Sequence, residues 1–189
     1  LVAQLAPNRN DRLVITYGGK AAEVPADPVT RYVLMGFLSM ARGQDVNPVN
    51  VRSLASSLGL IVEEVKAHEG PDYAEWMHVT AHADGGKVSA GGTFFGSHPR
   101  IVRLNGRNVE CVPEGVLFLM NNRDKPGMVG YIGSLMGEHE INIGSMSLNR
   151  DEEGGEALTV LNLDSVPPDA LLDKVNADPD ISNVQVIKL

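Results

Sequence analysis

The sequence predicts an α+β protein of two domains, a mixed α/β domain followed by a βαββαβ domain of the ferredoxin-like type. Residues 115–189 order their predicted strands and helices as β-α-β-β-α-β, which is the split βαβ plan. Residues 1–115 carry several strand runs with turn signals between them. The charge also divides, because residues 1–115 have a net charge of −1 and residues 116–189 have −7. Turn residues cluster at 113–115, so we predict domains at 1–114 and 115–189.

The composition argues against several classes of partner and site. The chain has 189 residues and a net charge of −8, which disfavours nucleic acid or a membrane as a partner. No apolar run approaches the ~18 residues of a membrane span. A single cysteine, Cys111, excludes internal disulfides and favours a reducing, cytoplasmic location. Residues 1–5 have the pattern of a helix end without an initiator methionine, so we expect a fragment of a longer protein.

The first strand and the long helix come early. Residues 13–17 predict a strand that stops at two glycines. Asp27 as N-cap and Pro28 at the first helical position predict a helix that runs to about residue 41. It is apolar on several sides, so we expect it to be buried in the domain or against a partner. Its apolar positions are Val29, Tyr32, Val33, Leu34, Phe37, Leu38 and Met40.

The rest of the first domain predicts a short helix and further strands. Asn50 can cap a helix over 51–58 that Gly59 ends. Asn105-Gly106 between alternating residues is a strong hairpin signal, because both turn positions need positive φ. A second turn is expected at 84–86. The strands are predicted at 60–65, 73–83, 87–95, 101–104 and 108–111.

The second domain predicts an antiparallel sheet with two helices on one face. The other face must then be covered or solvated, and the edge strands invite pairing with a second copy. A turn at 151–155 joins the middle strands. The strands are predicted at 115–120, 141–148, 156–163 and 181–187, and the helices at 126–138 and 168–177.

The stretch that suggests chemistry joins the first strand of this domain to its first helix. Asp124 follows the strand and Pro126 opens the predicted helix, whose free N–H groups form an anion site. An amino acid could place its carboxylate there and its ammonium on Asp124, with amide hydrogen bonds from Asn142. On spacing alone, an ordinary strand-to-helix turn, in which Asp124 bonds local backbone N–H groups, is the favoured explanation. Gly130 and Gly133 inside the helix indicate a close approach of another backbone or a ligand.

These residues resemble an ACT domain, the small regulatory module that binds amino acids. The resemblance lies in Asp124–Gly127, in the two helix glycines and in Ile141–Ile143. The upstream part resembles the allosteric substrate binding domain. In tandem, the two are similar to the C-terminal regulatory half of the D-3-phosphoglycerate dehydrogenase family, in its long bacterial form, from about residue 12 to residue 188. The upstream motifs lie at Val49–Gly59, Gly92–Gly96 and Arg103–Arg107.

The resemblance implies a function and a set of site residues. Family members oxidise 3-phosphoglycerate with NAD in serine biosynthesis, and their catalytic residues and cofactor lie in upstream domains. It implies that this region binds L-serine as a feedback inhibitor across a homodimer or tetramer interface. Asp124 and Asn142 match ligand-contacting positions, whereas Asn122 stands where the family often has Tyr or His. The effector site is therefore expected at Asp124, Asn142, Asn122, Gly127, Met128 and Val129.

The resemblance also implies an anion site in the first domain. Arg100 matches one basic position of the family, and Val112 stands where a second would be. Arg103 and Arg107 are near in sequence and could complete such a site. They could equally be solvated charges of a hairpin.

No catalytic or metal site is predicted in this chain. His78 and His82 are four residues apart, but they fall on a predicted strand without a third ligand. Three hypotheses remain: a serine-sensing regulatory region, an assembly domain that does not bind serine, and the regulatory part of an iron–sulfur L-serine dehydratase. The single cysteine disfavours the cluster-bearing part of the last.

Overall fold

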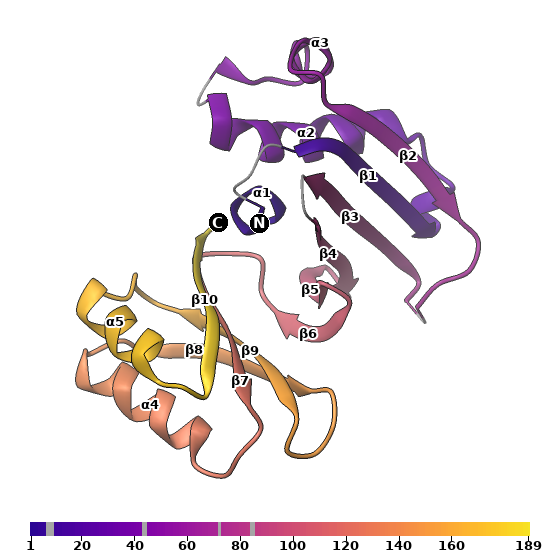
Figure 1. The fold of residues 1–189 in the computed structure, drawn as a ribbon. Helices are drawn as coiled ribbons and strands as arrows, with labels where there is room; N and C mark the ends of the chain where they lie inside the picture. Colours follow the sequence, from indigo (N-terminus) through magenta and orange to yellow (C-terminus); the bar gives the residue numbers. More distant parts are fainter. Residues whose placement is uncertain (7–9, 43–44, 72, 84–85) are drawn as a thin grey trace. The chain divides into compact units, whose positions relative to one another are not determined.

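The computed structural model describes residues 1–6, 10–42, 45–71, 73–83 and 86–189. Within these, the chain forms two compact units, residues 1–106 and residues 107–189 (Figure 1). This division assigns residues 107–114 to the second unit. The domain boundary after residue 114 stays a prediction.

The first unit is built on a mixed sheet with helices between its first two strands in sequence. The strand order is β2-β1-β3-β4-β5, with β1 parallel to β2 and the other pairs antiparallel. The strands are β1 (Asn10–Gly19), β2 (Ile61–Ala67), β3 (Glu75–Ala83), β4 (Gly86–Phe95) and β5 (His98–Leu104). The helices are α1 (Val2–Leu5), η1 (Lys20–Ala22), α2 (Ala26–Arg42) and α3 (Val51–Ser57).

The long helix α2 differs from its prediction in two respects. It begins at Ala26, so Asp27 is not the N-cap; its carboxylate instead accepts hydrogen bonds from Arg31 and Arg52. One stripe, which includes Leu34, is buried in the unit, whereas Tyr32 is 66% exposed. The first unit therefore buries one apolar face of α2 and leaves other apolar side chains of the helix exposed. Burial of the remaining apolar face against a partner stays a prediction.

The Asn-Gly turn has the predicted backbone geometry. Asn105 has φ +48° and Gly106 has φ +83°, as a type I′ turn requires. The turn separates β5 from β6 (Arg107–Cys111). Of the other predicted turn, residues 84 and 85 lie outside the described residues, and β3 and β4 flank them.

The second unit has the predicted ferredoxin-like fold. Its four-stranded sheet has the order β10-β7-β9-β8, and every neighbouring pair is antiparallel. In this order β8 is an edge strand. The elements are β7 (Val116–Arg123), α4 (Met128–Glu138), β8 (Ile143–Arg150), β9 (Glu156–Leu163), α5 (Asp169–Ala177) and β10 (Ile181–Lys188).

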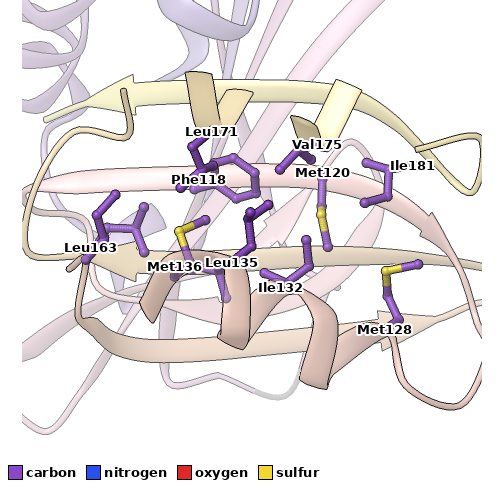
Figure 2. Packing of buried hydrophobic residues seen from close by; sticks show 12 residues of the cluster. Phe118, Met120, Met128, Ile132, Leu135, Met136, Leu163, Leu171, Val175 and Ile181 are labelled. Atoms are coloured by element: carbon purple, nitrogen blue, oxygen red, sulfur yellow. The ribbon is translucent and has the colours of Figure 1, made fainter. Parts of the chain in front are cut away.

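Both helices of this unit pack on one face of the sheet. Figure 2 shows Ile132 and Met136 of α4 beside Phe118 and Met120 of β7. Leu171 of α5 joins the same cluster, and these five side chains are almost fully buried. At about 1.5–3 kcal/mol for burying each such side chain, this cluster is a main source of stability for the unit.

The segment before β7 runs along the opposite face of this sheet. The backbone N–H of Glu110 donates to Ser147 Oγ at 3.0 Å, and that of Val112 donates to Asn162 Oδ1 at 3.2 Å. The amide of Asn162 donates back to the Val112 carbonyl oxygen at 3.0 Å. This segment therefore covers part of the face that the helices leave open.

The turn between β7 and α4 differs from the prediction that Pro126 opens the helix. The helix begins at Met128, and Gly127 is the N-cap with φ +92°. Left-handed backbone at this position is strained for any residue with a Cβ. Because a left-handed residue interrupts the chain after Pro126, the proline lies in the turn and not in the helix.

We expect Gly127→Ala to lower the free energy of unfolding by about 1–2 kcal/mol, because alanine would have to adopt the left-handed conformation. Gly130→Ala is the matched control. It lies inside α4, and an added Cβ would meet no atom within 4 Å, so it should raise stability by about 1 kcal/mol. Urea unfolding of both variants measures the difference. Two changes of the same sign would contradict the assigned turn.

Candidate functional site

Asp124 lies directly after β7 and is held by the β8–β9 hairpin. Its backbone N–H donates to the Gly155 carbonyl oxygen at 2.8 Å. Its Oδ2 atom accepts from Arg150 Nη1 at 2.9 Å and from the Gly154 N–H at 3.1 Å. The sheet register explains this position, because Arg123 pairs with Glu156 at the start of β9. The hairpin therefore folds back over the residue that follows β7.

These contacts fix the charge state of the carboxylate. The hydrogen bond from Arg150, and then that from Gly154, hold the pKa of Asp124 below its ordinary value. The same ion pair raises the pKa of Arg150. Both groups are therefore charged at neutral pH. Both contacts are made to Oδ2, and within the described part of the chain no hydrogen bond is made to Oδ1.

The local-turn interpretation and the ligand-site interpretation of Asp124 are compatible in this geometry. The carboxylate accepts a backbone N–H, as an ordinary turn would require. It nevertheless keeps an oxygen that can accept an ammonium group. Its side chain is 20% exposed, so it is reachable from solvent.

The start of α4, at residues 127–129, offers the candidate site its backbone N–H groups and only one exposed side chain. Gly127 has no side chain, Met128 is buried in the core, and Val129 is about half exposed. The first N–H groups of a helix lack intrahelical acceptors, and they make this end favourable for anions. Of the three predicted residues at this helix start, Met128 can thus contribute only its backbone.

Asn142 lies at the far end of β8 from Asp124. Its Nδ2 atom donates to Asp164 Oδ2 at 2.9 Å. The strand between Asn142 and Arg150 has eight residues, or roughly 25 Å of extended chain. One copy of the chain therefore does not bring Asp124 and Asn142 together.

Asn122 is buried inside the second unit. Only 3% of it is exposed, and it lies opposite Ala157 of β9 on the helix-covered face. Its Oδ1 atom accepts from Thr159 Oγ1 at 2.8 Å, and its Nδ2 donates to the Arg123 carbonyl oxygen at 3.0 Å. Its amide is thus used within the protein, where it satisfies a fully buried threonine.

Arg150 is the site residue that the sequence analysis missed. It lies 26 positions after Asp124, and no motif joins the two. Their contact depends on the register of β8 on β9, in which Arg150 lies opposite Ala157. The one signal in the sequence is that Arg150 is a charged residue at the end of a strand, just before a turn. By itself, such a residue indicates only a strand end that is exposed to solvent.

The residues predicted for the anion site fall in both units. Arg103 and Arg100 lie on β5, opposite Gly91 and Thr93 of β4. Because Gly91 has no side chain, Arg103 and His78 flank it closely. Arg107 belongs to the second unit.

The described contacts of Arg107 are to carboxylates. Its Nη2 atom lies 3.3 Å from Glu156 Oε2 and 3.7 Å from Asp151 Oδ2. A guanidinium held by two acidic side chains is less available to an anion than an uncompensated one. Within the first unit, Arg100 and Arg103 are the two predicted residues, and both lie on β5.

Burial lowers the pKa of His78, and the nearby charges of Arg103 and Lys87 lower it further. His78 is therefore neutral at pH 7. It adds a positive charge to this region only in more acidic solution.

Two further properties of the described residues bear on function. No helix among them is long and apolar enough to cross a membrane. They hold no group of three or more His, Cys, Asp or Glu side chains arranged to hold a metal ion.

Comparison with known proteins assigns both parts of the chain. A family described as "D-3-phosphoglycerate dehydrogenase intervening domain" matches residues 1–105, and the ACT domain family matches residues 116–180. The chain belongs to the D-3-phosphoglycerate dehydrogenase family. It corresponds to the C-terminal regulatory region, in which an intervening domain precedes an ACT domain.

Curated D-3-phosphoglycerate dehydrogenases match over the whole chain. The protein from Methanocaldococcus jannaschii is 33% identical over 189 residues, and that from Bacillus subtilis is 30% identical over 192. The protein from Synechocystis is 34% identical over 191 residues. This chain covers 36%, 36% and 34% of these relatives, so it spans about a third of a full-length D-3-phosphoglycerate dehydrogenase.

We expect Thr159→Val to cost about 1–3 kcal/mol of stability, because it leaves the Asn122 carbonyl oxygen buried without its partner. The double variant Thr159→Val with Asn122→Leu removes both polar groups and should recover part of that loss. Chemical denaturation of the two variants measures the difference. A single variant as stable as the parent would exclude this hydrogen bond as a determinant of the fold.

Proposed function

We propose that this region senses an amino acid, with L-serine as the effector, and that serine binding inhibits the parent enzyme by feedback. The carboxylate of Asp124 carries the proposal. It is charged at neutral pH, it keeps one oxygen without a described partner, and it lies beside a helix start in an ACT domain. An ammonium on Asp124 and a carboxylate near the helix start together match a zwitterion.

A complete site requires a second copy of the chain. Asp124 and Asn142 lie at opposite ends of β8, which is the edge strand of its sheet. If two β8 edges pair antiparallel about a two-fold axis, Asn142 of one copy lies at the Arg150 end of the other. Each dimer then has two equivalent sites, and each site draws residues from both copies.

Apolar side chains on β8 also favour this pairing. Met146 and Leu148 lie opposite Leu161 and Thr159 of β9, on the face that the helices cover. Both are nevertheless 38% exposed in one copy. A second copy on the same edge would remove this apolar area from water, which stabilises association.

The energetics set limits on this mechanism. Serine has few heavy atoms, so a micromolar dissociation constant, which is about −8 kcal/mol, already requires good pairing of both charged groups. Coupling between an effector site and a remote active site is typically about 1–3 kcal/mol. A dimer interface that tightens when serine bridges two copies could deliver coupling of this size to attached catalytic domains.

The dehydrogenase reaction is assigned to domains outside this chain. The family implies NAD as the oxidant, but the glycine turn at Gly127 does not suit a dinucleotide. It follows a strand of an antiparallel sheet, whereas the dinucleotide fingerprint lies between parallel strands. We therefore assign this region regulation and assembly, with the catalytic domains as its partners, in a cytoplasmic enzyme of serine biosynthesis.

An assembly domain without serine binding is the second candidate. The burial of Asn122 favours it, because that amide is already used by Thr159. The L-serine dehydratase alternative has less support, since the relatives found are named dehydrogenases.

Mixing two binding-deficient variants tests the shared site. Asp124→Ala and Asn142→Ala should each abolish serine binding by calorimetry. After unfolding and refolding together, half of the dimers are mixed and each holds one intact site, so about a quarter of the parent binding should return.

Each variant refolded alone is the control and should stay inactive. If the mixture recovers nothing while the parent binds serine, Asp124 and Asn142 do not share a site across two copies. If the parent gives neither heat nor a thermal shift at millimolar serine, the assembly candidate replaces the sensor.

We also propose a weak anion site at Arg100 and Arg103 on the first unit. His78 is neutral at pH 7 and gains charge as the pH falls through its lowered pKa, so the affinity for sulfate should rise below about pH 6.5. Arg103→Gln should remove most of this binding, whereas Arg123→Gln in the second unit should not. Calorimetry with sulfate at pH 5.5 and 7.5 measures the effect. Equal affinity at both pH values would exclude His78 from the site.

A further inference from the structure

We propose that Arg150 binds the carboxylate of the amino-acid effector and thereby selects amino acids over other amines. This inference rests on the proposed sensing function and deepens it. It assigns the second charge of the site to a side chain of the β8–β9 hairpin, in addition to the helix start. Arg150 is the last residue of β8, and its side chain is 53% exposed.

The ion pair with Asp124 leaves both partners able to bind more. Arg150 contacts Asp124 through Nη1, and in the described chain its other guanidinium N–H groups make no hydrogen bond. Asp124 uses only Oδ2 for Arg150 and Gly154. An ammonium can therefore bind Oδ1, and a carboxylate can bind the remaining N–H groups, without breaking the existing pair.

The geometry of this pair matches an α-amino acid. The ammonium and the carboxylate of such a ligand are separated by a single carbon atom. The carboxylate of Asp124 and the guanidinium of Arg150 are in direct contact at 2.9 Å, with their charges in the opposite order. A zwitterion can lie alongside them so that each of its charges meets an opposite one. The planar guanidinium also presents paired N–H donors that suit a carboxylate.

The other cations near this turn are less suited to the role. Lys125 forms an ion pair with Asp180, and Arg107 is held by Glu156 and Asp151. Arg123 pairs with Glu156 in the sheet register. The residue before it, Asn122, has its side chain on the helix-covered face of the sheet. Successive residues of a strand point to opposite faces, so Arg123 points to the other face of the sheet. Arg150 is the cation in contact with Asp124.

Acidic residues of the β8–β9 hairpin increase the need for a cation that binds the ligand carboxylate. Asp151, Glu152 and Glu153 follow Arg150 directly, and their charges would repel the carboxylate of a ligand. Without Arg150, the helix start would have to hold that carboxylate against these charges. The structure therefore predicts that loss of Arg150 penalises ligands with a carboxylate more than ligands without one.

A comparison of L-serine with L-serinamide tests this assignment. Serinamide keeps the ammonium and the hydroxymethyl group but replaces the carboxylate with a neutral amide. At about pH 6 both α-amino groups are protonated. The parent chain should bind serine at least about tenfold more tightly than serinamide, the size expected for one charge-assisted contact. In Arg150→Gln this ratio should fall to about one, mainly through loss of serine affinity.

Two further variants complete the experiment. Arg150→Lys keeps the charge without the planar fork, so its serine-to-serinamide ratio should be intermediate. Arg123→Gln removes a nearby cation on the other face and should leave the ratio unchanged. Circular dichroism and thermal unfolding confirm that the variants are folded before calorimetry.

The possible results separate this inference from the proposed function. If Arg150→Gln weakens serine and serinamide by the same factor, Arg150 only positions Asp124, and the inference is wrong while the sensor proposal stands. If the parent binds serine and serinamide equally, no side chain selects the carboxylate and the inference is again wrong. If the parent binds neither ligand at millimolar concentration, the sensor proposal fails and this assignment fails with it.

Discussion

The hold of the β8–β9 hairpin on Asp124 is the interaction on which the candidate site depends. Three contacts fix Asp124, the residue that follows β7. Its backbone N–H donates to the Gly155 carbonyl oxygen, and its carboxylate accepts from the Gly154 N–H and pairs with Arg150. These contacts link two segments far apart in sequence and keep a charged carboxylate at the surface. The neighbouring Lys125 is fixed separately, by its ion pair with Asp180.

Much of this fold could be predicted because its signals are local. The alternation of strands and helices in residues 115–189 predicted the ferredoxin-like unit, and the Asn105-Gly106 pair predicted the turn with positive φ. The errors were local as well. Pro126 and Asp27 are typical helix-start residues, but the left-handed Gly127 delays one helix and the other begins one residue before Asp27.

The candidate site was harder to predict because it depends on contacts between distant residues. Asp124 could be singled out from its place after a strand. Its partner Arg150 could not, because their contact follows from strand register. The environment of Asn122 was hidden for a similar reason: only the pairing of β7 with β9 places Thr159 within hydrogen-bond distance. Side chains that share no local motif are brought together by the sheet alone.

The separation of Asp124 and Arg150 from the hydrophobic cluster has an evolutionary consequence. The cluster of Figure 2 lies between the sheet and its helices, whereas both charged residues lie at the ends of strands and are partly exposed. Under the proposed sensing function, substitutions at these two positions would change which small molecule is recognised at little cost to folding. Because the residues that stabilise the fold differ from those proposed to bind the ligand, related domains can diverge in ligand specificity while they keep the same architecture.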